Sequence, residues 1–388
     1  MEYRRLMAKK VFLVAGARPN FMKIAPIIRA MKKHPGLTPV LIHTGQHYDK
    51  NMSGTFFESL GIPDPDYNLQ VGSASHAVQT AEIMVRFEEI CIKEKPDVVL
   101  VVGDVNSTIA AGLAAKKLNI TLAHVEAGLR SGDRTMPEEI NRLATDAITD
   151  LFFTTEKEAT SNLLKEGHAS ENVHFVGHVM IDNLFYQLKT LDEMKVLGEV
   201  VAIKKQLPQK YICMTMHRPS NVDNKENLEK ILTAINVVSK TAPVVFPIHP
   251  RTKKNIEQFN LGHLLDTERI ITTQPLDYND FLYLWKDVAL MVTDSGGLQE
   301  ETTALKIPCI TIRENTERPI TVEVGSNVVV GTDSQKIIDN AMNALQGKWK
   351  CCAIPELWDG LASERIADLI GDKKMIGSND ITKLYAHC

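Results

Sequence analysis

The stretch VTDSGGLQEETTALKIPCI, from Val292 to Ile310, contains the pattern that decides the fold. An apolar run ends in DSGG, a helical pattern follows at once, and a second apolar run closes the unit. This succession predicts two parallel strands joined by a crossover helix. The paired glycines let the backbone approach a ligand closely, and the free N–H groups at the helix start favour an anion such as phosphate. The competing interpretation is ordinary capping by Asp294 or Ser295, with the glycines in a tight turn.

The same alternation of short apolar runs and helical patterns extends through both halves of the chain. The runs lack polar alternation, which is typical of parallel strands buried on both faces. We therefore predict an α/β fold with two Rossmann-like doubly wound domains. The chain between Val179 and Leu207 is helical and charged, and we expect the domains to be connected there. The expected strands are Lys10–Gly16, Thr38–His43, Asp97–Gly103, Thr121–Val125, Leu151–Thr155, Val173–Val176, Tyr211–Met216, Val244–Ile248, Ile270–Thr273, Leu290–Thr293 and Cys309–Ile312.

The composition is that of an ordinary globular protein, with 388 residues of which 44% are hydrophobic and 24% are charged. This length is sufficient for two domains of typical size. The net charge of −4 does not indicate nucleic acid or a membrane surface as a partner. The six cysteines form no CxxC pair and no zinc spacing, so we expect reduced thiols, no metal and a cytoplasmic location. No apolar stretch has the length of a signal sequence or a membrane span.

Three carboxylates follow predicted strands in the first half of the chain. Asp104 lies in GDVNST, Glu126 in HVEAGLR and Glu138 in MPEEINR. Because the carboxyl ends of parallel strands meet at one edge, we expect these groups to lie close together and to transfer protons. The alternatives are that Asp104 caps the next helix, that the glutamates only begin a helix, and that arginines pair with them. The arginines of that alternative are Arg130, Arg134 and Arg142.

Cationic residues also follow predicted strands, in both halves of the chain. Arg18 and Lys23 lie in GARPNFMK, and Arg318 lies in RENTERP. An arginine can bind a diphosphate through two parallel hydrogen bonds. His217 in MHRPSN and His249 in IHPR each have an arginine close by in the sequence. Since no third ligand stands at metal spacing, the two histidines indicate an anionic substrate rather than a metal.

These residues, together with the DSGG stretch, predict a diphosphate site. Arg18 and Arg318 would be the cationic partners of a diphosphate held by Ser295-Gly296-Gly297. Glu301, one turn into the same helix, could accept hydrogen bonds from a ribose diol. The expected ligand is therefore nucleotide-like, and the acidic residues indicate an enzyme.

Nine motifs occur in order over almost the whole chain: GARPNFMKIAP, HTGQHYD, GDVNST, HVEAGLRSGD, MPEEINR, MHRPSN, IHPR, TDSGGLQEE and RENTERP. As an ordered set they resemble the non-hydrolysing UDP-N-acetylglucosamine 2-epimerases. The resemblance implies two Rossmann-like domains in a GT-B arrangement, with the active site in the interdomain cleft and no cofactor. It implies reversible conversion of UDP-GlcNAc to UDP-ManNAc through elimination of UDP to a 2-acetamidoglucal and re-addition. The product would supply surface polysaccharide, and a homodimer is expected.

The resemblance also assigns domains and residue roles. It implies a first domain of residues 1–180, joined by the C-terminal helix and the tail 372–388, and a UDP-binding domain of residues 181–371. Trp358 to Ile370 resembles the family's returning helix. The catalytic residues would be Asp104, Glu126, Glu138 and His217, where His217 would also hold the diphosphate. The substrate would be bound by Arg18, Lys23, His249, Ser295, Gly296, Gly297, Glu301 and Arg318.

Some motifs differ from those of relatives. MHRPSN replaces the HRREN of many relatives, and Asp49 stands where many bacterial relatives have glutamine, which argues against an activating UDP-GlcNAc site of the same form. The stretch from Thr44 to Leu69 also resembles epimerases that act on a UDP-2,3-diacetamido-uronic acid, whereas ERPITVEVG resembles the UDP-GlcNAc branch. The alternatives are such a uronic acid epimerase, a hydrolysing epimerase, a GT-B glycosyltransferase, or a non-catalytic nucleotide-sugar sensor. A transferase does not need three acids, and a sensor could lose them.

Overall fold

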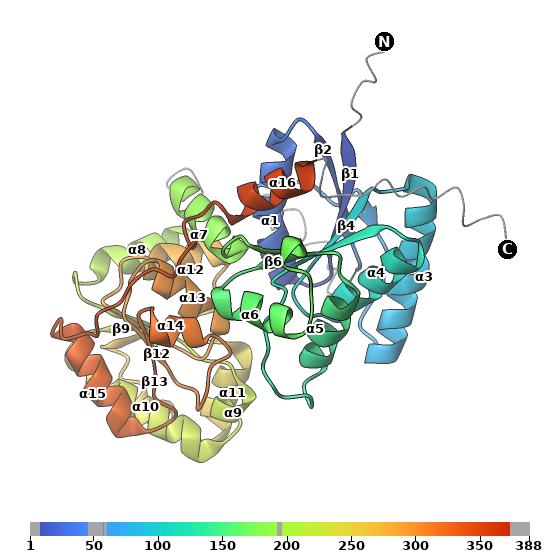
Figure 1. Cartoon of the computed structure of the whole chain (residues 1–388). Coiled ribbons are helices and arrows are strands. Elements are labelled where there is room, and N and C mark those ends of the chain that lie inside the picture. The colour runs from blue at the N-terminus through green and yellow to red at the C-terminus, as the bar shows by residue number, and fades with distance from the viewer. Residues whose placement is uncertain (1–7, 46–56, 58–59, 192–195, 373–388) are drawn as a thin grey trace, which may run out of the picture. The chain divides into compact units, whose positions relative to one another are not determined.

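The computed structural model describes residues 8–45, 57, 60–191 and 196–372 (Figure 1). These residues form two compact units. One contains the described residues of Met1–Tyr186 and Glu356–Cys388, and the other contains those of Gln187–Pro355. Each unit is built on one parallel sheet with helices between its strands, so the predicted α/β class is confirmed.

The first unit has a parallel sheet in the order β3-β2-β1-β4-β5-β6-β7, as far as the described residues show it. The order reverses between β1 and β4, which is the feature of a doubly wound sheet. Its strands are β1 (Lys9–Ala15), β2 (Leu37–His43), β3 (Tyr67–Asn68), β4 (Val98–Val102), β5 (Thr121–Val125), β6 (Leu151–Thr154) and β7 (Val173–Phe175). Its helices are α1 (Arg18–Lys33), α3 (His76–Glu94), α4 (Asn106–Lys117), α5 (Pro137–Ile148), α6 (Lys157–Lys165), η1 (Ser170–Asn172), the first part of α7 (Val179–Thr190) and α16 (Ala362–Gly371).

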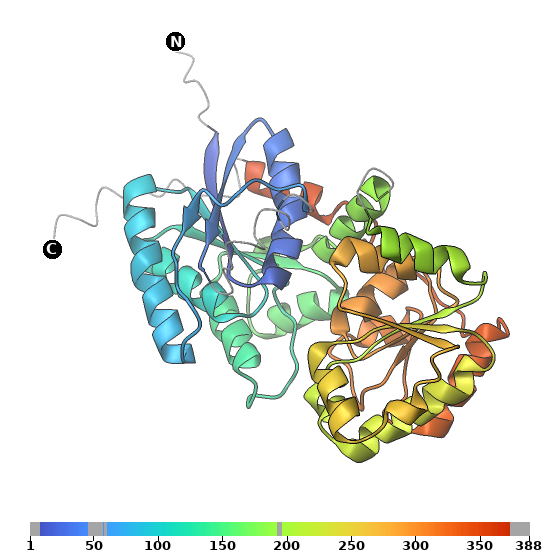
Figure 2. The same ribbon diagram turned by 180° about the vertical axis from the view of Figure 1, so that it is seen from behind.

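Apolar side chains explain why these strands are central. Every residue of β4 and β5 is buried, because helices cover both faces of the sheet. Phe12 and Val14 of β1 join a core with Ile83 and Phe87 of α3. α4 fits between α3 and α5, as both views of the ribbon show (Figures 1 and 2), since it faces its neighbours with small residues such as Ala110.

The second unit repeats this architecture with a parallel sheet in the order β10-β9-β8-β11-β12-β13. Its core joins the strands to α10 and α15 through buried aliphatic side chains. Its strands are β8 (Ile212–Thr215), β9 (Val244–Pro247), β10 (Ile270–Thr273), β11 (Leu290–Thr293), β12 (Cys309–Thr311) and β13 (Asn327–Val329). Its helices are the end of α7, α8 (Gly198–Gln206), α9 (Pro219–Val222), α10 (Lys225–Ser239), α11 (Pro250–Gln258), η2 (Gly262–Leu264), α12 (Tyr278–Trp285), α13 (Gly296–Ala304), α14 (Pro319–Glu323) and α15 (Ser334–Leu345).

The chain returns to the first unit after residue 355. Trp358 is 2% exposed, donates its indole N–H to the carbonyl of Thr155 at 3.3 Å and packs edge-on against His178. The carboxylate of Asp182 accepts the N–H groups of Ala362 and Ser363 and so caps α16, which packs on α1. Residues 356–372 are therefore part of the first unit's own core.

The expected domains stay a prediction. They are residues 1–180 with 372–388, and residues 181–371. The compact units change at residues 186 and 355, because α7 begins in the first unit and Trp358 packs there. The expected tail lies outside the described residues apart from Asp372. Gln46 to Asp49, which carry part of HTGQHYD, also lie outside them.

Candidate active site

Three strand ends meet at the carboxyl edge of the first sheet. Gly16 follows β1, Thr44 follows β2, and Ser107 begins the helix after β4. The hydroxyls of Thr44 and Ser107 lie 2.9 Å apart, and a Cβ at Gly16 would lie 2.1 Å from the Ser107 hydroxyl. Glycine is therefore required at residue 16 so that the first residues of α4 can approach the end of β1.

Glu126 stands directly after β5 and forms an ion pair with Lys23 of α1. The Lys23 ammonium lies 2.5 Å from Glu126 Oε2, and only 15% and 4% of the two side chains are exposed. Glu126 has a φ of +68°, a left-handed conformation that is uncommon for a residue with a side chain. Hydrogen bonds from the N–H groups of Glu126 and Ala127 to the carbonyl of Phe153 hold this turn. The structure thus places two of the predicted residues together, Lys23 and Glu126.

Gly103 brings the ends of β4 and β5 close together. Its φ is +65°, and a Cβ there would lie 3.2 Å from the Lys23 ammonium and 3.7 Å from Glu126 Oε2. A side chain at this position would therefore crowd the ion pair. Asp104, the next residue, is consequently brought to the same edge of the sheet as Glu126.

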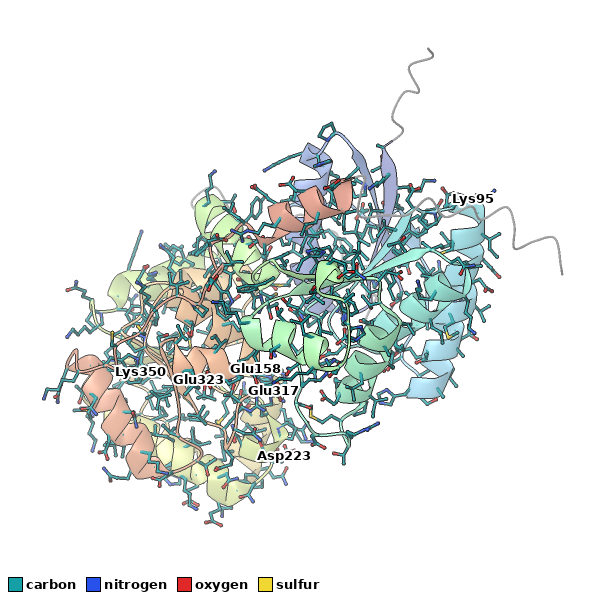
Figure 3. The ribbon with its side chains drawn as sticks, viewed as in Figure 1. Lys95, Glu158, Asp223, Glu317, Glu323 and Lys350 are labelled. Carbon is teal, nitrogen blue, oxygen red and sulfur yellow. The ribbon has the colours of Figure 1, made fainter. Side chains whose placement is uncertain are left out.

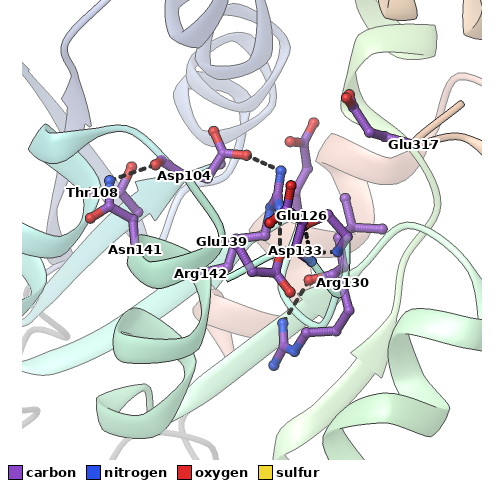
Figure 4. Close-up of polar contacts among 12 residues, drawn as sticks. Asp104, Thr108, Glu126, Arg130, Asp133, Glu139, Asn141, Arg142 and Glu317 are labelled. Carbon is purple, nitrogen blue, oxygen red and sulfur yellow. Dashed lines mark hydrogen bonds and ion pairs between the residues drawn. The ribbon is translucent and has the colours of Figure 1, made fainter. Parts of the chain in front are cut away.

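Asp104 is held by an arginine of α5. Arg142 donates to Asp104 Oδ2 at 2.6 Å and to Glu139 Oε2 at 2.7 Å, so it bridges two carboxylates (Figure 4). Asn141 donates to the backbone carbonyl of Asp104 at 2.9 Å. α4 begins after Val105 without a side-chain cap, so the alternative that Asp104 caps this helix is wrong.

Glu139 and its neighbour Glu138 have different surroundings. Glu139 is 2% exposed and accepts the N–H groups of Ser131 and Gly132, which fastens the loop before α5. Burial alone would raise the pKa of Glu139, but these hydrogen bonds and that of Arg142 lower it. Glu138, the predicted acid or base, is exposed in the first turn of α5.

In the second unit, Asp294 organises the end of β11. Its carboxylate is fully buried and accepts the N–H groups of His217 and Arg218 and the amide of Asn221. Nδ1 of His217 lies 3.1 Å from Asp294 Oδ1. Burial would raise the pKa of Asp294, but the hydrogen bonds and the charge of His217 lower it. His217 and the DSGG stretch are thereby joined at one strand edge, and Asp294 is no helix cap.

Ser295, Gly296 and Gly297 begin α13. Ser295 stands at the N-cap position, yet its side chain makes no cap hydrogen bond. Neither glycine has a positive φ, and a Cβ at either one would meet no described atom within 4 Å. Packing and backbone conformation therefore do not explain the glycine pair.

Three arginines gather around Glu317 in the second unit, where Figure 3 labels it. Arg313 donates to Glu317 at 3.0 Å. Burial would raise the pKa of Glu317, but the hydrogen bond and charge of Arg313, with the charges of Arg218 and Arg318, lower it. Arg318 also forms an ion pair with Glu300 of α13. The loop before α14 is thus tied to the helix that begins with the glycine pair.

Glu301 and His249 both have partners that the sequence did not reveal. Glu301 is 4% exposed and accepts the hydroxyl of Tyr278 at 2.7 Å. His249 caps α11 by accepting the N–H of Arg251, and its ring centroid lies 5.8 Å from that of His217. Burial, followed by the charges of His217 and Arg251, lowers the pKa of His249, so it is neutral at pH 7.

The remaining predictions concern Arg18, metals and membranes. Arg18 is the first residue of α1, and its side chain is outside the described part. The described residues contain no group of three or more His, Cys, Asp or Glu side chains that could hold a metal. None of the described helices has the length and apolar character needed to cross a membrane.

A family model described as UDP-N-acetylglucosamine 2-epimerase matches residues 29–371. The chain belongs to this epimerase family. It is 42% identical over 372 residues to the UDP-N-acetylglucosamine 2-epimerase of Methanococcus maripaludis, covering 94% of this chain and 99% of the relative. It is 38% identical to the UDP-2,3-diacetamido-2,3-dideoxy-D-glucuronate 2-epimerase of Pseudomonas aeruginosa, covering 93% and 99%.

A solved structure of this epimerase family supports the fold. The Methanocaldococcus jannaschii UDP-GlcNAc 2-epimerase, in complex with UDP-GlcNAc and UDP, matches with a TM-score of 0.78 and 43% identity. The match covers 93% of this chain and 99% of that one. The predicted class of two doubly wound sheets of the GT-B type is confirmed.

Several residues that support the predicted site in this epimerase carry no clear signal in the sequence. Arg142 and Glu139 both lie in the MPEEINR motif, which indicated only that an arginine could pair with a glutamate there. Arg130 pairs with Asp146 and Glu166 rather than with the glutamates of α5. For Tyr278 no signal existed, because its contact with Glu301 spans 23 residues and two elements.

Proposed function

We propose that this epimerase interconverts UDP-GlcNAc and UDP-ManNAc without a cofactor, by eliminating UDP to a 2-acetamidoglucal and adding it back. The C2 proton of the sugar has no adjacent carbonyl, so simple removal would leave an unstabilised carbanion. Loss of UDP across the C1–C2 bond avoids that carbanion. Re-protonation of C2 from the opposite face, with return of UDP to C1, gives the epimer. The reaction needs a base on one face, an acid on the other, and cations at the diphosphate.

The observation that carries the proposal is the pair of carboxylates at the first sheet's edge. Glu126 and Asp104 are each held by a cation, Lys23 and Arg142, at 2.5 and 2.6 Å. Both carboxylates therefore have fixed positions, which proton transfer at a defined atom requires. We assign Asp104, Glu126 and Glu138 as the acid and base residues, and Lys23 as a substrate-side cation.

The second unit supplies the residues for the leaving diphosphate. We propose that the start of α13, from Ser295 to Gly297, binds the diphosphate with His217, Arg318 and Arg18. Glu301, oriented by Tyr278, would accept the ribose hydroxyls. His249 supports His217 as a neutral neighbour. The proposal requires that one substrate meets both sets of residues, and closure around it would keep the glucal bound.

Proton NMR of UDP-GlcNAc with the pure protein in deuterium oxide, with no cofactor added, tests the proposal. We expect deuterium at C2 together with UDP-ManNAc signals. Free ManNAc would instead identify a hydrolysing epimerase. Absence of any change with UDP-GlcNAc contradicts the proposed substrate. A UDP-2,3-diacetamido-uronic acid is the second candidate, favoured by the 38% identity to the Pseudomonas aeruginosa enzyme, and the same experiment with that sugar tests it.

We also propose that the epimerase is a homodimer that pairs through α3. Val78, Val85 and Ile92 recur every seven residues on this helix and are 53%, 59% and 44% exposed. Residues seven apart lie on the same face of a helix, and an exposed apolar stripe of this kind marks a surface that packs on another protein surface. Light scattering should give a dimer mass for the wild type and a monomer mass for Val85→Glu. Val237→Glu, on α10 in the second unit, is the control that should leave the mass unchanged.

The cytoplasmic location and the surface polysaccharide that would consume the product remain predictions.

A further inference from the structure

A histidine with no exposed surface lies beneath the predicted catalytic edge. His124 is the fourth residue of β5, two residues before Glu126, and is 0% exposed. Its Nδ1 lies 2.7 Å from Asp146 Oδ1, and its Nε2 lies 2.8 Å from the carbonyl oxygen of Gly103. Both partners are strong acceptors, so both ring nitrogens are engaged in short hydrogen bonds.

The partners determine where the protons are. A carbonyl oxygen only accepts, so Nε2 must carry a hydrogen for the bond to Gly103. Nδ1 must then either carry a second hydrogen, which makes an imidazolium, or accept a proton held by Asp146. The two possibilities differ by the ionisation of the Asp146 carboxyl group.

The other contacts of Asp146 decide between these possibilities. Asp146 Oδ2 accepts the N–H of Gly128 at 3.0 Å and lies 2.8 Å from the guanidinium of Arg130, which stays charged in proteins. A carboxylate surrounded by these donors is ionised, so the proton between Asp146 and His124 belongs to the ring.

The same pair connects the two loops that carry the predicted catalytic carboxylates. His124 holds the carbonyl of Gly103, and Asp104 is the next residue. Asp146 holds the N–H of Gly128, two residues after Glu126. Gly128 has a φ of +79°, and a Cβ there would lie 2.3 Å from the carbonyl of Ala159, so this turn has little freedom to shift. Asp146 itself comes from α5, which also provides Arg142, the partner of Asp104.

We propose that His124, with a hydrogen on both ring nitrogens, acts with Asp146 as a positioning pair that sets the spacing of Asp104 and Glu126. The importance of this spacing for catalysis rests on the proposed function, in which Asp104 and Glu126 transfer protons. The protonation state does not depend on it. Neither His124 nor Asp146 is assigned any contact with the substrate, so their effect on the reaction passes through the two loops.

The first experiment measures the protonation state directly. Two-dimensional ¹⁵N–¹H NMR of the histidine rings distinguishes an imidazolium from either neutral tautomer. We expect a hydrogen on both ring nitrogens of His124, as its hydrogen bonds to Asp146 and Gly103 require. His174, which has its pKa lowered by burial, is the internal control and should show a neutral pattern. A neutral tautomer of His124 would overturn the proposal whether or not the protein is active.

The second experiment measures the positioning. Asp146→Asn keeps the size of the side chain but removes the charge that stabilises the imidazolium. We expect kcat for C2 deuterium exchange to fall about 10- to 100-fold with KM little changed, because misplacing a catalytic group by about 1 Å costs that much. The same variant should show a neutral His124 in the NMR experiment, which links the two readouts.

Asp150→Asn is the matched control. Asp150 also pairs with a cation at 2.7 Å, Lys116, and also holds a backbone N–H, that of Leu122, at the other end of the same strand. We expect this variant to lose stability but not kcat. An unchanged kcat in Asp146→Asn, or an equal loss in Asp150→Asn, would overturn the positioning role. An inactive wild type with a protonated His124 would refute the proposed function alone.

Discussion

At the scale of single residues, the candidate site is a set of carboxylates whose positions are fixed by buried partners. Glu126 forms an ion pair with Lys23, and Asp104 forms one with Arg142. Asp294 accepts hydrogen bonds from the N–H groups that follow β8, and Glu301 accepts one from the Tyr278 hydroxyl. In each case the partner comes from another element. A carboxylate that is already held in place spends little conformational entropy when it meets a substrate.

Glu126→Gln should nearly abolish the reaction. The amide cannot act as a base or an acid, and we expect kcat to fall roughly 10²- to 10⁴-fold. The measurement is the rate of C2 deuterium incorporation, with circular dichroism to verify the fold. Glu226→Gln is the control, because Glu226 also pairs with a lysine but is exposed on α10. A variant of Glu126 that keeps more than about half of the wild-type rate would exclude this residue as acid or base.

Asp294→Asn should change how stability depends on pH. The pKa of Asp294 is lower in the folded state than its unfolded value of about 3.9, so the ionised group stabilises the fold above that value. This contribution is lost as the pH falls through the folded pKa. At neutral pH we expect the variant to be less stable by about 1–3 kcal/mol. Urea unfolding of both proteins should show this gap shrinking below about pH 4, and a gap that stays constant would contradict ionisation of Asp294 as its cause.

At this scale the sequence predicted where the candidate residues lie in the fold better than which side chains they contact. Asp104 and Glu126 follow the neighbouring strands β4 and β5, where the sequence pattern placed them, and Lys23 of α1 pairs with Glu126. The pairing of Arg142 with Asp104 was not predictable, since it depends on how α5 rotates over the sheet. The distinction between the buried Glu139 and the exposed Glu138 depends on the same rotation.

At the scale of elements, hydrophobic runs predicted the central strands and the edge strands β7 and β10, whereas the edge strands β3 and β13 were missed. β3 is the dipeptide Tyr67–Asn68, and β13 is Asn327–Val329. Such short runs carry little periodicity of their own, and β3 and β13 are strands because the neighbouring strand offers hydrogen-bond partners. The helix start at Gly296 was predictable because its signal is local.

Gly296→Ala and Gly297→Ala should separate folding from binding. A Cβ at either position meets no described atom within 4 Å, so we expect the free energy of unfolding to change by less than about 1 kcal/mol. UDP binding, measured by calorimetry, should weaken by about tenfold or more, since a methyl group would keep the diphosphate from the helix start. Unchanged affinity in both variants would show that the glycines do not face the ligand.

Gly16→Ala is the contrasting variant, because its Cβ would lie 2.1 Å from the Ser107 hydroxyl. We expect it to lose about 1–3 kcal/mol of stability through overpacking. Equal stability of all three variants would show that the space around each glycine does not determine whether alanine is tolerated there.

At the scale of the whole molecule, each unit has its own doubly wound sheet. The first unit also includes residues 356–372, which follow the second unit in the sequence. Trp358, almost fully buried, anchors that segment. Trp358→Ala should destabilise the first unit by about 3–5 kcal/mol, because a large buried side chain is replaced by a cavity. Hydrogen exchange should show lost protection in β1, β4 and β5, with β8 and β11 unchanged.

Trp349→Ala tests whether a loss in the second unit leaves the first sheet intact. Trp349 belongs to the second unit and donates its indole N–H to Ser326. We expect its loss to affect β12 and β13 and to leave the first sheet protected. If either variant loosens both sheets equally, the two units do not unfold independently.

The return of residues 356–372 to the first unit sets an order of events during synthesis of the protein. The second unit is contiguous from Gln187 to Pro355, so it can fold as soon as it has left the ribosome. The first sheet is made earlier, but its unit is complete only when Trp358 and α16, which Asp182 caps, have been made after the second unit. The domain that carries the proposed acid and base residues is therefore begun first and completed last.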